Sequence, residues 1–363
     1  MKIAVFEPYI SGFGGAQKVI SKYCAYLKLK GHNVEIFTQR YDKKNSYLEF
    51  NDIKINLIKP KMKNLSFVSF LRKFNGFDLY VSNDFPSNFI SIFNKPSVWI
   101  CYSPKREFYD LKKFYFNNSS IIKKLFLYMK CALFLRIDIL SAKKTTVIFS
   151  ISKNIKKRVQ KYYNIYSNNM FKCGIDFKDY KEGRFENYFL CVSRLVKPKR
   201  VDLIIKSMSY IKNNNVKLYV VGVGTEYQKL RNLVQNSKNI KFFGGISDKK
   251  LMSLYANSCG VIYTPFDEDW GLVPLEAGAS GKPTIGVNEG GLKEIIKDEV
   301  SGFLINQVSP QKIAEKIDFL VSNKKKAKRM GKEAKKISKK YDWNIILPEF
   351  NDNLLNHNLF QRK

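Results

Sequence analysis

The sequence predicts an α/β protein built from two doubly wound parallel sheets. Short apolar runs alternate with amphipathic segments along almost the whole chain, which is typical of parallel strands covered by helices on both faces. The alternation starts afresh at Tyr188. With 363 residues, the chain is also longer than the size at which a single core usually stops growing. We therefore expect two domains of the same fold class.

The first domain opens with the apolar run KIAVFEP, which we interpret as a strand and not as a signal peptide, because its apolar part ends at Glu7-Pro8. A helix is expected at Gly15–Lys30, where apolar residues recur with helical spacing. Further strands are expected at HNVEIFTQ, FDLYVSN, SVWICYS and TTVIFSIS. The last of them leads into a predicted helix at Lys153–Tyr163.

The second domain repeats the pattern with expected strands at YFLCVSRL, VKLYVVG, NIKFFG, GVIYTP and PTIGV. Helices are expected between and after them, at Val201–Ile211, Tyr227–Asn236, Asp248–Asn257, Leu272–Ser280 and beyond Pro310. The aperiodic stretch Cys173–Tyr188 marks the boundary. We predict domains at 1–180 and 186–340, and a segment 341–363 whose helix, without a strand partner, packs back on the first domain.

Charge and cysteine content restrict the class of protein. There are 64 basic and 31 acidic side chains, a net charge of +33, and residues 105–161 hold 15 basic and three acidic ones. Such a field attracts nucleic acid, an anionic membrane or phosphorylated small molecules, or it reflects a lysine-rich composition that makes every surface basic. The six cysteines are scattered without paired spacing, which indicates a reducing cytosol and neither disulfides nor a zinc site.

Residues 267–291 carry the densest group of acidic and glycine residues. Open parallel sheets bind ligands at the carboxyl ends of their strands, so with two sheets we expect a site in the cleft between them. Glu268 would lie in a loop at such an end, and the free amides of the helix starting at Leu272 form an anion site. Glu276 follows one turn later, and Gly271 allows close approach. A solvated loop acid and a helix-dipole glutamate are the structural alternative.

Two further motifs favour a phosphate ligand. Arg194 and Lys199 follow the strand YFLCV, and together they supply the cations that neutralise a diphosphate without a metal, although two ordinary basic residues would look the same. The glycine loop at residues 11–16 follows the first strand and also suits a phosphate or sugar. As a dinucleotide fingerprint this loop is incomplete, and so is Gly222-x-Gly224.

Taken in order, these motifs resemble the retaining glycosyltransferases of family four, which have the GT-B fold. The resemblance rests on S-R-L-x-x-x-K, V-G-x-G, F-x-G, the pair Glu268 and Glu276 around W-G-L-V-P-L-E-A, and the later G-x-P and G-G-x-x-E. It covers nearly the whole of 188–304 and only a few points of the first half. It implies that the second domain binds a nucleotide-sugar donor and the first domain the acceptor.

The resemblance also assigns roles to single residues. Arg194 and Lys199 would hold the donor diphosphate, and Glu276 the ribose hydroxyls. Glu268 would hold the donor sugar, together with backbone groups of Trp270, Gly271, Leu272 and Val273 that also contact a phosphate. The base would contact Gly245 and Ile246, and the phosphates would lie near Gly14 and Gly15. No metal or other cofactor is expected, because side-chain cations and helix amides supply the positive charge.

Tyr102 departs from the pattern. The stretch WICYSPKREFYD resembles a branch that uses GDP-mannose, but that branch has histidine where this chain has Tyr102. A tyrosine still donates a hydrogen bond to a sugar or phosphate oxygen. It does not carry protons near neutral pH, because its ordinary pKa is about 10. We expect transfer to remain feasible, since the leaving diphosphate accepts the acceptor's proton, with weakened activity as the alternative.

The resulting hypothesis is a metal-independent retaining glycosyltransferase that moves a hexose, mannose in the first instance, to a glycan or lipid-linked acceptor. A catalytically weakened sugar-nucleotide-binding protein, a nicotinamide-dependent oxidoreductase and a basic nucleic-acid-binding protein are the alternatives, the last without a recognisable binding module. We expect a cytoplasmic location, peripheral on the membrane face. The lysine-bearing apolar stretch Ser119–Arg136 would either lie on anionic lipid or form a buried helix of the first domain.

Overall fold

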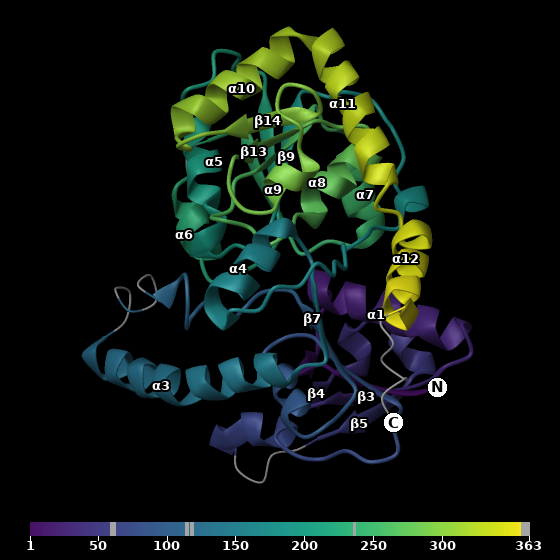
Figure 1. Cartoon of the computed structure of the whole chain (residues 1–363). Helices are drawn as coiled ribbons and strands as arrows, with labels where there is room; N and C mark the ends of the chain where they lie inside the picture. The colour runs from purple at the N-terminus through teal and green to yellow at the C-terminus, as the bar shows by residue number, and fades with distance from the viewer. Residues whose placement is uncertain (59–62, 113–115, 117–119, 235–236, 357–363) are drawn as a thin grey trace. The chain divides into compact units, whose positions relative to one another are not determined.

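The computed structural model describes residues 1–58, 63–112, 116, 120–234 and 237–356 (Figure 1). The chain divides into two compact units. Unit 1 comprises Met1–Lys172 together with Leu347–Lys363, and unit 2 comprises Cys173–Ile346. The stretch predicted to separate the domains therefore belongs to unit 2, and the C-terminal segment from Leu347 belongs to unit 1.

Unit 1 contains a six-stranded sheet in the order β5-β3-β1-β6-β7-β8, and every pairing in it is parallel. Its central strands are almost entirely apolar and buried, as expected for a sheet covered on both faces. The strands are β1 (Lys2–Phe6), β3 (Asn33–Thr38), β5 (Lys54–Leu57), β6 (Leu79–Ser82), β7 (Ser97–Cys101) and β8 (Val147–Ser150); β2 (Tyr9–Ile10) pairs separately with β4 (Arg40–Tyr41).

Among the residues described in full, unit 1 contains the α-helices α1 (Gly15–Leu29), α3 (Ile121–Lys144) and α4 (Lys153–Tyr163). The side chain of Ser152 caps α4 by accepting a hydrogen bond from the amide of Ile155. Helix α12 (Trp343–Asn356) enters unit 1 at Leu347. Its Phe350 packs against the rings of Tyr23 and Phe171, so the end of the chain contributes to the core of unit 1.

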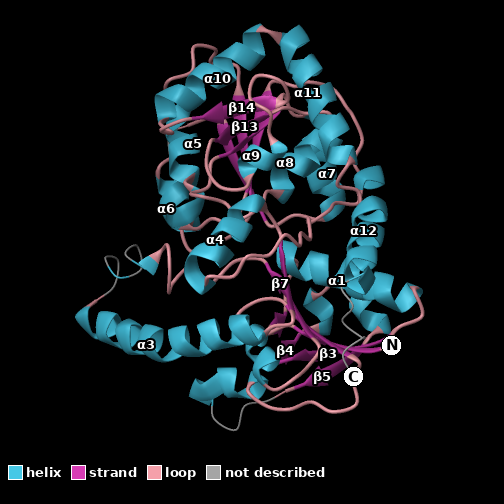
Figure 2. Ribbon diagram, viewed as in Figure 1, coloured by secondary structure: helices cyan, strands magenta, loops and turns pink. Residues whose placement is uncertain are grey.

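Unit 2 also contains a six-stranded parallel sheet, in the order β11-β10-β9-β12-β13-β14. Figure 2 shows strands β13 and β14 of this sheet with helices around them. The strand order reverses between β9 and β12, because β10 and β11 lie on one side of this pair and β13 and β14 on the other. The strands are β9 (Tyr188–Val192), β10 (Lys217–Val221), β11 (Ile240–Gly244), β12 (Gly260–Tyr263), β13 (Thr284–Val287) and β14 (Gly302–Ile305).

Two helices of unit 2 begin at serine residues whose side chains cap them. Ser247 caps α7, and Ser309 caps α10 with Pro310 in its first turn. The helices are α5 (Val201–Ser207), α6 (Tyr227–Asn232), α7 (Asp248–Asn257), α8 (Leu272–Ala279), α9 (Leu292–Ile295), α10 (Pro310–Ser322) and α11 (Lys324–Lys339).

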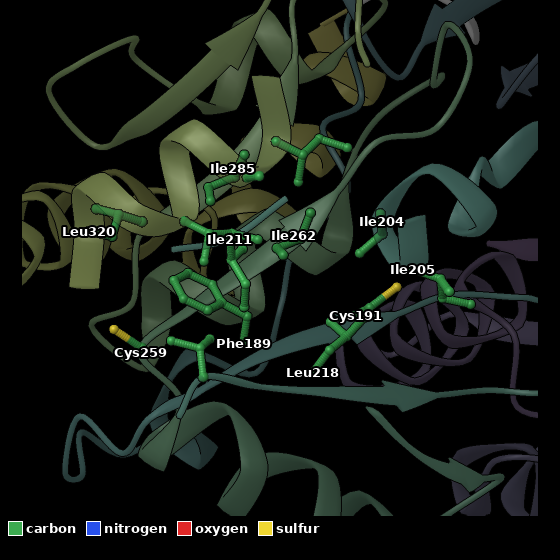
Figure 3. Packing of buried hydrophobic residues seen from close by; sticks show 14 of the residues in the cluster. Phe189, Cys191, Ile204, Ile205, Ile211, Leu218, Cys259, Ile262, Ile285 and Leu320 are labelled. Atoms are coloured by element: carbon green, nitrogen blue, oxygen red, sulfur yellow. The ribbon is translucent and has the colours of Figure 1, made fainter. Parts of the chain in front are cut away.

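The core of unit 2 joins its sheet to the surrounding helices (Figure 3). Phe189, Cys191 and Leu218 contribute from the strands, and Ile204 and Leu320 contribute from helices α5 and α10. These side chains are almost fully buried. The strands are therefore held rigidly, and the loops at their carboxyl ends start from fixed positions.

These observations confirm the predicted fold of two parallel-sheet α/β domains. Sequence reasoning did not predict β5 and β14, which each form one edge of a sheet. It also extended α5 and α6 too far, because α5 ends at Ser207 and α6 at Asn232. Residues 235–236, the predicted end of one helix, and residues 357–363 of the predicted C-terminal segment lie outside the described residues. Within the part of the chain that the structure describes, none of the helices is long and apolar enough to span a bilayer.

Candidate functional site

The candidate site of unit 2 lies where the strand order reverses. Strands β9 and β12 are neighbours in the sheet, and the loops that follow them run from Ser193 and from Thr264. A reversal of strand order leaves room between two loops that diverge to opposite faces of the sheet. The first loop contains Arg194 and Lys199, and the second contains Glu268. The fold thus brings three of the predicted site residues to one edge of one sheet.

Lys199 and Glu268 are in direct contact. The Nζ atom of Lys199 lies 2.6 Å from Oε2 of Glu268 and 3.3 Å from the hydroxyl oxygen of Tyr263. The ammonium group also lies 5.6 Å from the centre of the Tyr263 ring. Both charged side chains are largely but not completely shielded from solvent. A cation and a carboxylate therefore share a partly shielded position at the end of β12, and such a pair suits an anionic or hydroxylated ligand.

Arg194 belongs to the same electrostatic environment. Burial raises the pKa of Tyr263 far above its ordinary value, the charges of Glu268 and Glu276 raise it further, and Arg194 opposes them. Four predicted site residues, counting Lys199, therefore act on one buried phenol. Arg194 itself is exposed, so its guanidinium is accessible to a ligand. Lys199 and Glu268 thus meet at Tyr263 by direct contact, and Arg194 and Glu276 act on it through their charges.

Glu276 is held by phenol groups. It lies on α8, and its Oε2 atom accepts a hydrogen bond of 2.7 Å from the hydroxyl of Tyr255. Burial raises the pKa of Tyr180, and Glu276 raises it further through its charge and a hydrogen bond. The rings of Tyr180 and Tyr255 are 6.1 Å apart. Neutral donors therefore orient this carboxylate without cancelling its charge.

Helix α8 begins shortly after the loop that carries Glu268. Its N-cap residue is Gly271, and among the described residues no side chain caps it. The first amides of a helix lack partners within the helix, so those of Leu272 and Val273 suit an anion. The preceding Trp270 is buried, and its indole N–H donates to the carbonyl of Cys173 at 3.0 Å. Trp270 thus fixes the start of the helix, and its indole N–H is already used in this internal hydrogen bond.

The glycine pair at 290–291 explains the glycine content of this segment. A Cβ atom on Gly290 would lie 2.2 Å from the carbonyl oxygen of Glu268, and one on Gly291 would lie 2.6 Å from that of Asp269. Gly290 also has a φ of +59°. The amide of Gly291 donates to the carbonyl of Glu268 at 2.7 Å. The loop carrying Glu268 therefore packs backbone to backbone against this pair.

A second glycine pair supports the loop that carries Arg194. A Cβ atom on Gly222 would lie 1.9 Å from the carbonyl oxygen of Ser193, and one on Gly224 would lie 2.3 Å from that of Leu195. The amide of Leu195 donates to the carbonyl of Val223 at 2.9 Å. The motif Gly222-x-Gly224 therefore serves internal packing of the site.

Arg200 and Glu289 join the loops around the site. Nη1 of Arg200 lies 2.9 Å from Oε1 of Glu289, and the other carboxylate oxygen accepts a hydrogen bond of 3.0 Å from the amide of Asp267. Arg200 has a φ of +51° and Asp267 a φ of +44°. Left-handed backbone at residues other than glycine costs about 1–3 kcal/mol and is frequent at functional sites. This ion pair therefore holds Lys199 and Glu268 in register.

The remaining predicted residues lie at other loops. Gly245 and Ile246 follow β11, the edge strand of the unit 2 sheet, and Gly245 is exposed. Gly14 and Gly15 belong to unit 1, where they are exposed at the start of α1. Tyr102 also belongs to unit 1 and is buried directly after β7. Gly245 follows the end of a strand and Gly15 begins a helix, as predicted, whereas Tyr102 lies just after β7, which ends before the last two residues of the predicted strand SVWICYS.

Sequence reasoning missed several polar residues of the site. These are Tyr180, Tyr255 and Tyr263, which surround the two glutamates, and Arg200 and Glu289, which join the loops. Tyr263 alone had a local signal, since it ends the strand before Glu268. The others are far apart in the chain, and only the fold brings them together.

The comparisons with known proteins agree with this architecture. The model of the family "Glycosyl transferases group 1" matches residues 175–337. A glycosyltransferase of Methanocaldococcus jannaschii is 31% identical over 53% of this chain and 52% of its own length. An alpha-1,3/1,6-mannosyltransferase of Dictyostelium discoideum is 23% identical over 91% of this chain and 92% of its own length. A second glycosyltransferase of Methanocaldococcus jannaschii is 28% identical over 58% of this chain, which therefore spans only 52% and 60% of the lengths of these two relatives.

The solved structures extend the likeness to the whole chain. HepE of Anabaena, solved in complex with UDP-glucose, superimposes with a TM-score of 0.80 at 17% identity, over 98% of this chain and all of that one. The sucrose-phosphate synthase of Thermosynechococcus elongatus gives the same TM-score at 18% identity, over the full length of both. These likenesses confirm the predicted GT-B fold. Residues 175–337 match the glycosyl transferases group 1 family, in agreement with the predicted family resemblance.

Proposed function

We propose that the protein transfers a hexose from a nucleotide-diphosphate sugar to a glycan or lipid-linked acceptor, with retention of the anomeric configuration. The observation that supports this most is the joint environment of Arg194, Lys199, Glu268 and Glu276 around Tyr263, at the reversal of strand order. Two cations suit a diphosphate, and two carboxylates suit pairs of sugar hydroxyls. A nicotinamide site would need neither the cations nor the second glutamate.

The ion pair between Lys199 and Glu268 gives the proposed binding step a physical form. An incoming diphosphate competes with Glu268 for the ammonium group, since phosphate oxygens are strong acceptors for it. Glu268, released from Lys199, then accepts hydrogen bonds from the donor sugar. Arg194, being exposed, reaches the same phosphates. The cations neutralise the charge that develops on the leaving diphosphate, and the proposal therefore involves no metal.

The retaining step is proposed to use the leaving group as the base. The bond between the anomeric carbon and the diphosphate oxygen breaks, the acceptor oxygen bonds to the same face of that carbon, and the acceptor's proton passes to the departing diphosphate. Tyr102 is proposed to donate a hydrogen bond to a sugar or phosphate oxygen from unit 1. Tyr102 is buried and stands where a GDP-mannose branch has histidine. The alternative function is therefore a sugar-nucleotide-binding protein with weakened transfer.

GDP-mannose is the first donor to test. Curated relatives are mannosyltransferases, and one of Mycobacterium tuberculosis is described as GDP-mannose-dependent. HepE binds UDP-glucose, so UDP-sugars form the second group. We further propose a cytoplasmic location at the membrane face, because the net charge of +33 favours anionic surfaces.

A donor panel followed by a transfer assay tests the proposal. GDP-, UDP- and ADP-sugars are screened for thermal stabilisation. A ligand at 100 times its Kd should raise the free energy of unfolding by about 2.7 kcal/mol. Transfer to a mixed glycan acceptor pool is then measured with the donor that binds, and the product anomer is identified by NMR. The hypothesis fails if no nucleotide sugar stabilises the protein, or if the product is inverted.

Replacement of Glu276 separates the enzyme from the binding protein. Glu276→Gln keeps an acceptor for the Tyr255 hydroxyl but loses the charge. We expect transfer to fall about 10- to 100-fold, the range for one charge-assisted hydrogen bond. The matched control is Glu333→Gln on α11, where the carboxylate forms an ion pair with Lys336 at 2.7 Å. A binding protein without transfer would bind the donor but show no transfer activity, in the wild type or in either variant.

A further inference from the structure

Helix α3 presents an apolar face to solvent. Over its first three turns, six large apolar side chains are 55–84% exposed: Ile121, Ile122, Leu125, Tyr128, Met129 and Leu133. Their spacing of three and four residues puts them on one side of the helix. Figure 1 shows this end of α3 extending away from the sheet of unit 1. Contiguous apolar surface of this kind marks an interaction site.

The opposite side of α3 is fixed by the core of unit 1. Cys131 and Asp138 are buried there, and Phe134 packs against Phe67 with ring centres 4.6 Å apart. The carboxylate of Asp138 accepts hydrogen bonds of 2.8 Å from Asn88 and from the hydroxyls of Tyr109 and Tyr163. This network sets the rotation of the helix about its axis. Because the opposite side of α3 packs against the core of unit 1, the apolar stripe faces solvent.

The charges around this face have one sign. Helix α3 contains six basic residues and one acidic residue, the buried Asp138. In the wider segment 105–161, Glu107 pairs with Lys105, and Asp110 pairs with Arg106 and Arg158. All three acidic side chains of this segment are thus engaged within unit 1. Among the side chains of α3 that the structure describes, the exposed charges are the cations Arg136, Lys143 and Lys144.

We propose that α3 docks unit 1 on an anionic phospholipid surface, with its axis in the plane of the membrane. The apolar stripe would enter the boundary between headgroups and acyl chains, and the cations at its C-terminal end would contact the headgroups. A second copy of the chain fits less well, because its α3 would bring further cations against these. The inference goes beyond the proposed transfer, since vesicle binding requires no donor or acceptor.

Vesicle flotation with the full chain tests the docking. Wild-type protein should bind vesicles of phosphatidylcholine mixed with phosphatidylglycerol, bind pure phosphatidylcholine much less, and be released in part by salt. Leu125→Gln combined with Leu133→Gln should lower the partition coefficient at least about tenfold, since two buried leucine side chains are lost from the membrane. Each of Lys143→Gln and Lys144→Gln should lower binding to the anionic vesicles about fivefold.

The matched control replaces two leucines elsewhere in unit 1. Leu29 and Leu48 are 86% and 79% exposed and belong to other elements, so Leu29→Gln with Leu48→Gln should leave vesicle binding unchanged. Equal thermal unfolding of the two double variants shows that both are folded. The proposal is overturned if wild-type protein does not bind, if both double variants lose binding equally, or if light scattering shows a dimer that only the α3 variant abolishes. Transfer to a soluble acceptor is measured in parallel and should not change.

Discussion

The glycine motifs of unit 2 and of unit 1 look alike in sequence and differ in surroundings. In unit 2, Cβ atoms on Gly222 and Gly290 would lie about 2 Å from the backbone of the loops that carry Arg194 and Glu268. In unit 1, Gly12 has nothing within 4 Å of such an atom, and that of Gly14 would meet only the side chain of Gln17. The first set is used for internal packing, and the second faces solvent.

The glycines of the two units therefore have different roles. Contact with backbone cannot be relieved by a rotamer change, so the glycines of unit 2 determine where the charged loops lie. The glycines of unit 1 leave open space at the exposed start of α1, which suits the approach of a ligand. Substitutions should therefore affect folding in unit 2 and ligand interactions in unit 1.

Gly222→Ala should give the largest loss of stability. Its Cβ would lie 1.9 Å from the carbonyl oxygen of Ser193, and its φ is +131°. Strain and overpacking together should lower the free energy of unfolding by about 3 kcal/mol, measured by urea denaturation. Gly245→Ala is the control, since its Cβ would meet only Val223, at 4.0 Å. A similar loss in both variants would contradict the packing role.

Gly290→Ala should combine a smaller loss of stability with weaker donor binding. The carbonyl oxygen and amide of Glu268 would lie 2.2 and 2.6 Å from the new Cβ, so this loop has to move. We expect a loss of about 2 kcal/mol in unfolding free energy and a clear rise in the Kd for the donor, measured by calorimetry. Unchanged donor binding in a folded variant would show that the position of Glu268 does not matter.

Gly14→Ala should have the smallest effect on stability. Gly14 is the N-cap residue of α1 and is exposed, so the loss should stay below about 1 kcal/mol. If a ligand approaches this loop, transfer activity should fall while thermal unfolding changes little. A variant with normal activity would remove Gly14 from the proposed ligand contacts.

The fold was predictable because its signal is local. Strands such as β12 are continuous apolar runs, and α4 and α7 have the bounds that periodicity predicted. The edge strand β5 was missed because it is short, only partly buried and begins with an exposed lysine, so its sequence resembles a loop. The predicted helix Val201–Ile211 was likewise too long, because α5 ends at Ser207 and a turn follows.

The site was predictable only in its charged residues. Arg194, Lys199, Glu268 and Glu276 belong to short motifs with recognisable spacing. Their partners are not local: Glu289 follows Arg200 by 89 residues and still forms an ion pair with it. Nothing in the spacing of tyrosines distinguishes Tyr255 from the other phenols of the chain. Residues such as Glu289 and Tyr255 are brought to the site by the packing of the fold, and no sequence motif marks them.

The central claim is that Lys199 binds the diphosphate of a nucleotide. Calorimetry with the matching nucleoside diphosphate and monophosphate tests it, using wild-type protein and Lys199→Met, which keeps most of the apolar stem. The account predicts that the wild-type protein prefers the diphosphate, and that the substitution weakens its binding about 10- to 100-fold while changing monophosphate binding much less. Equal affinity of both proteins for the diphosphate would contradict the account.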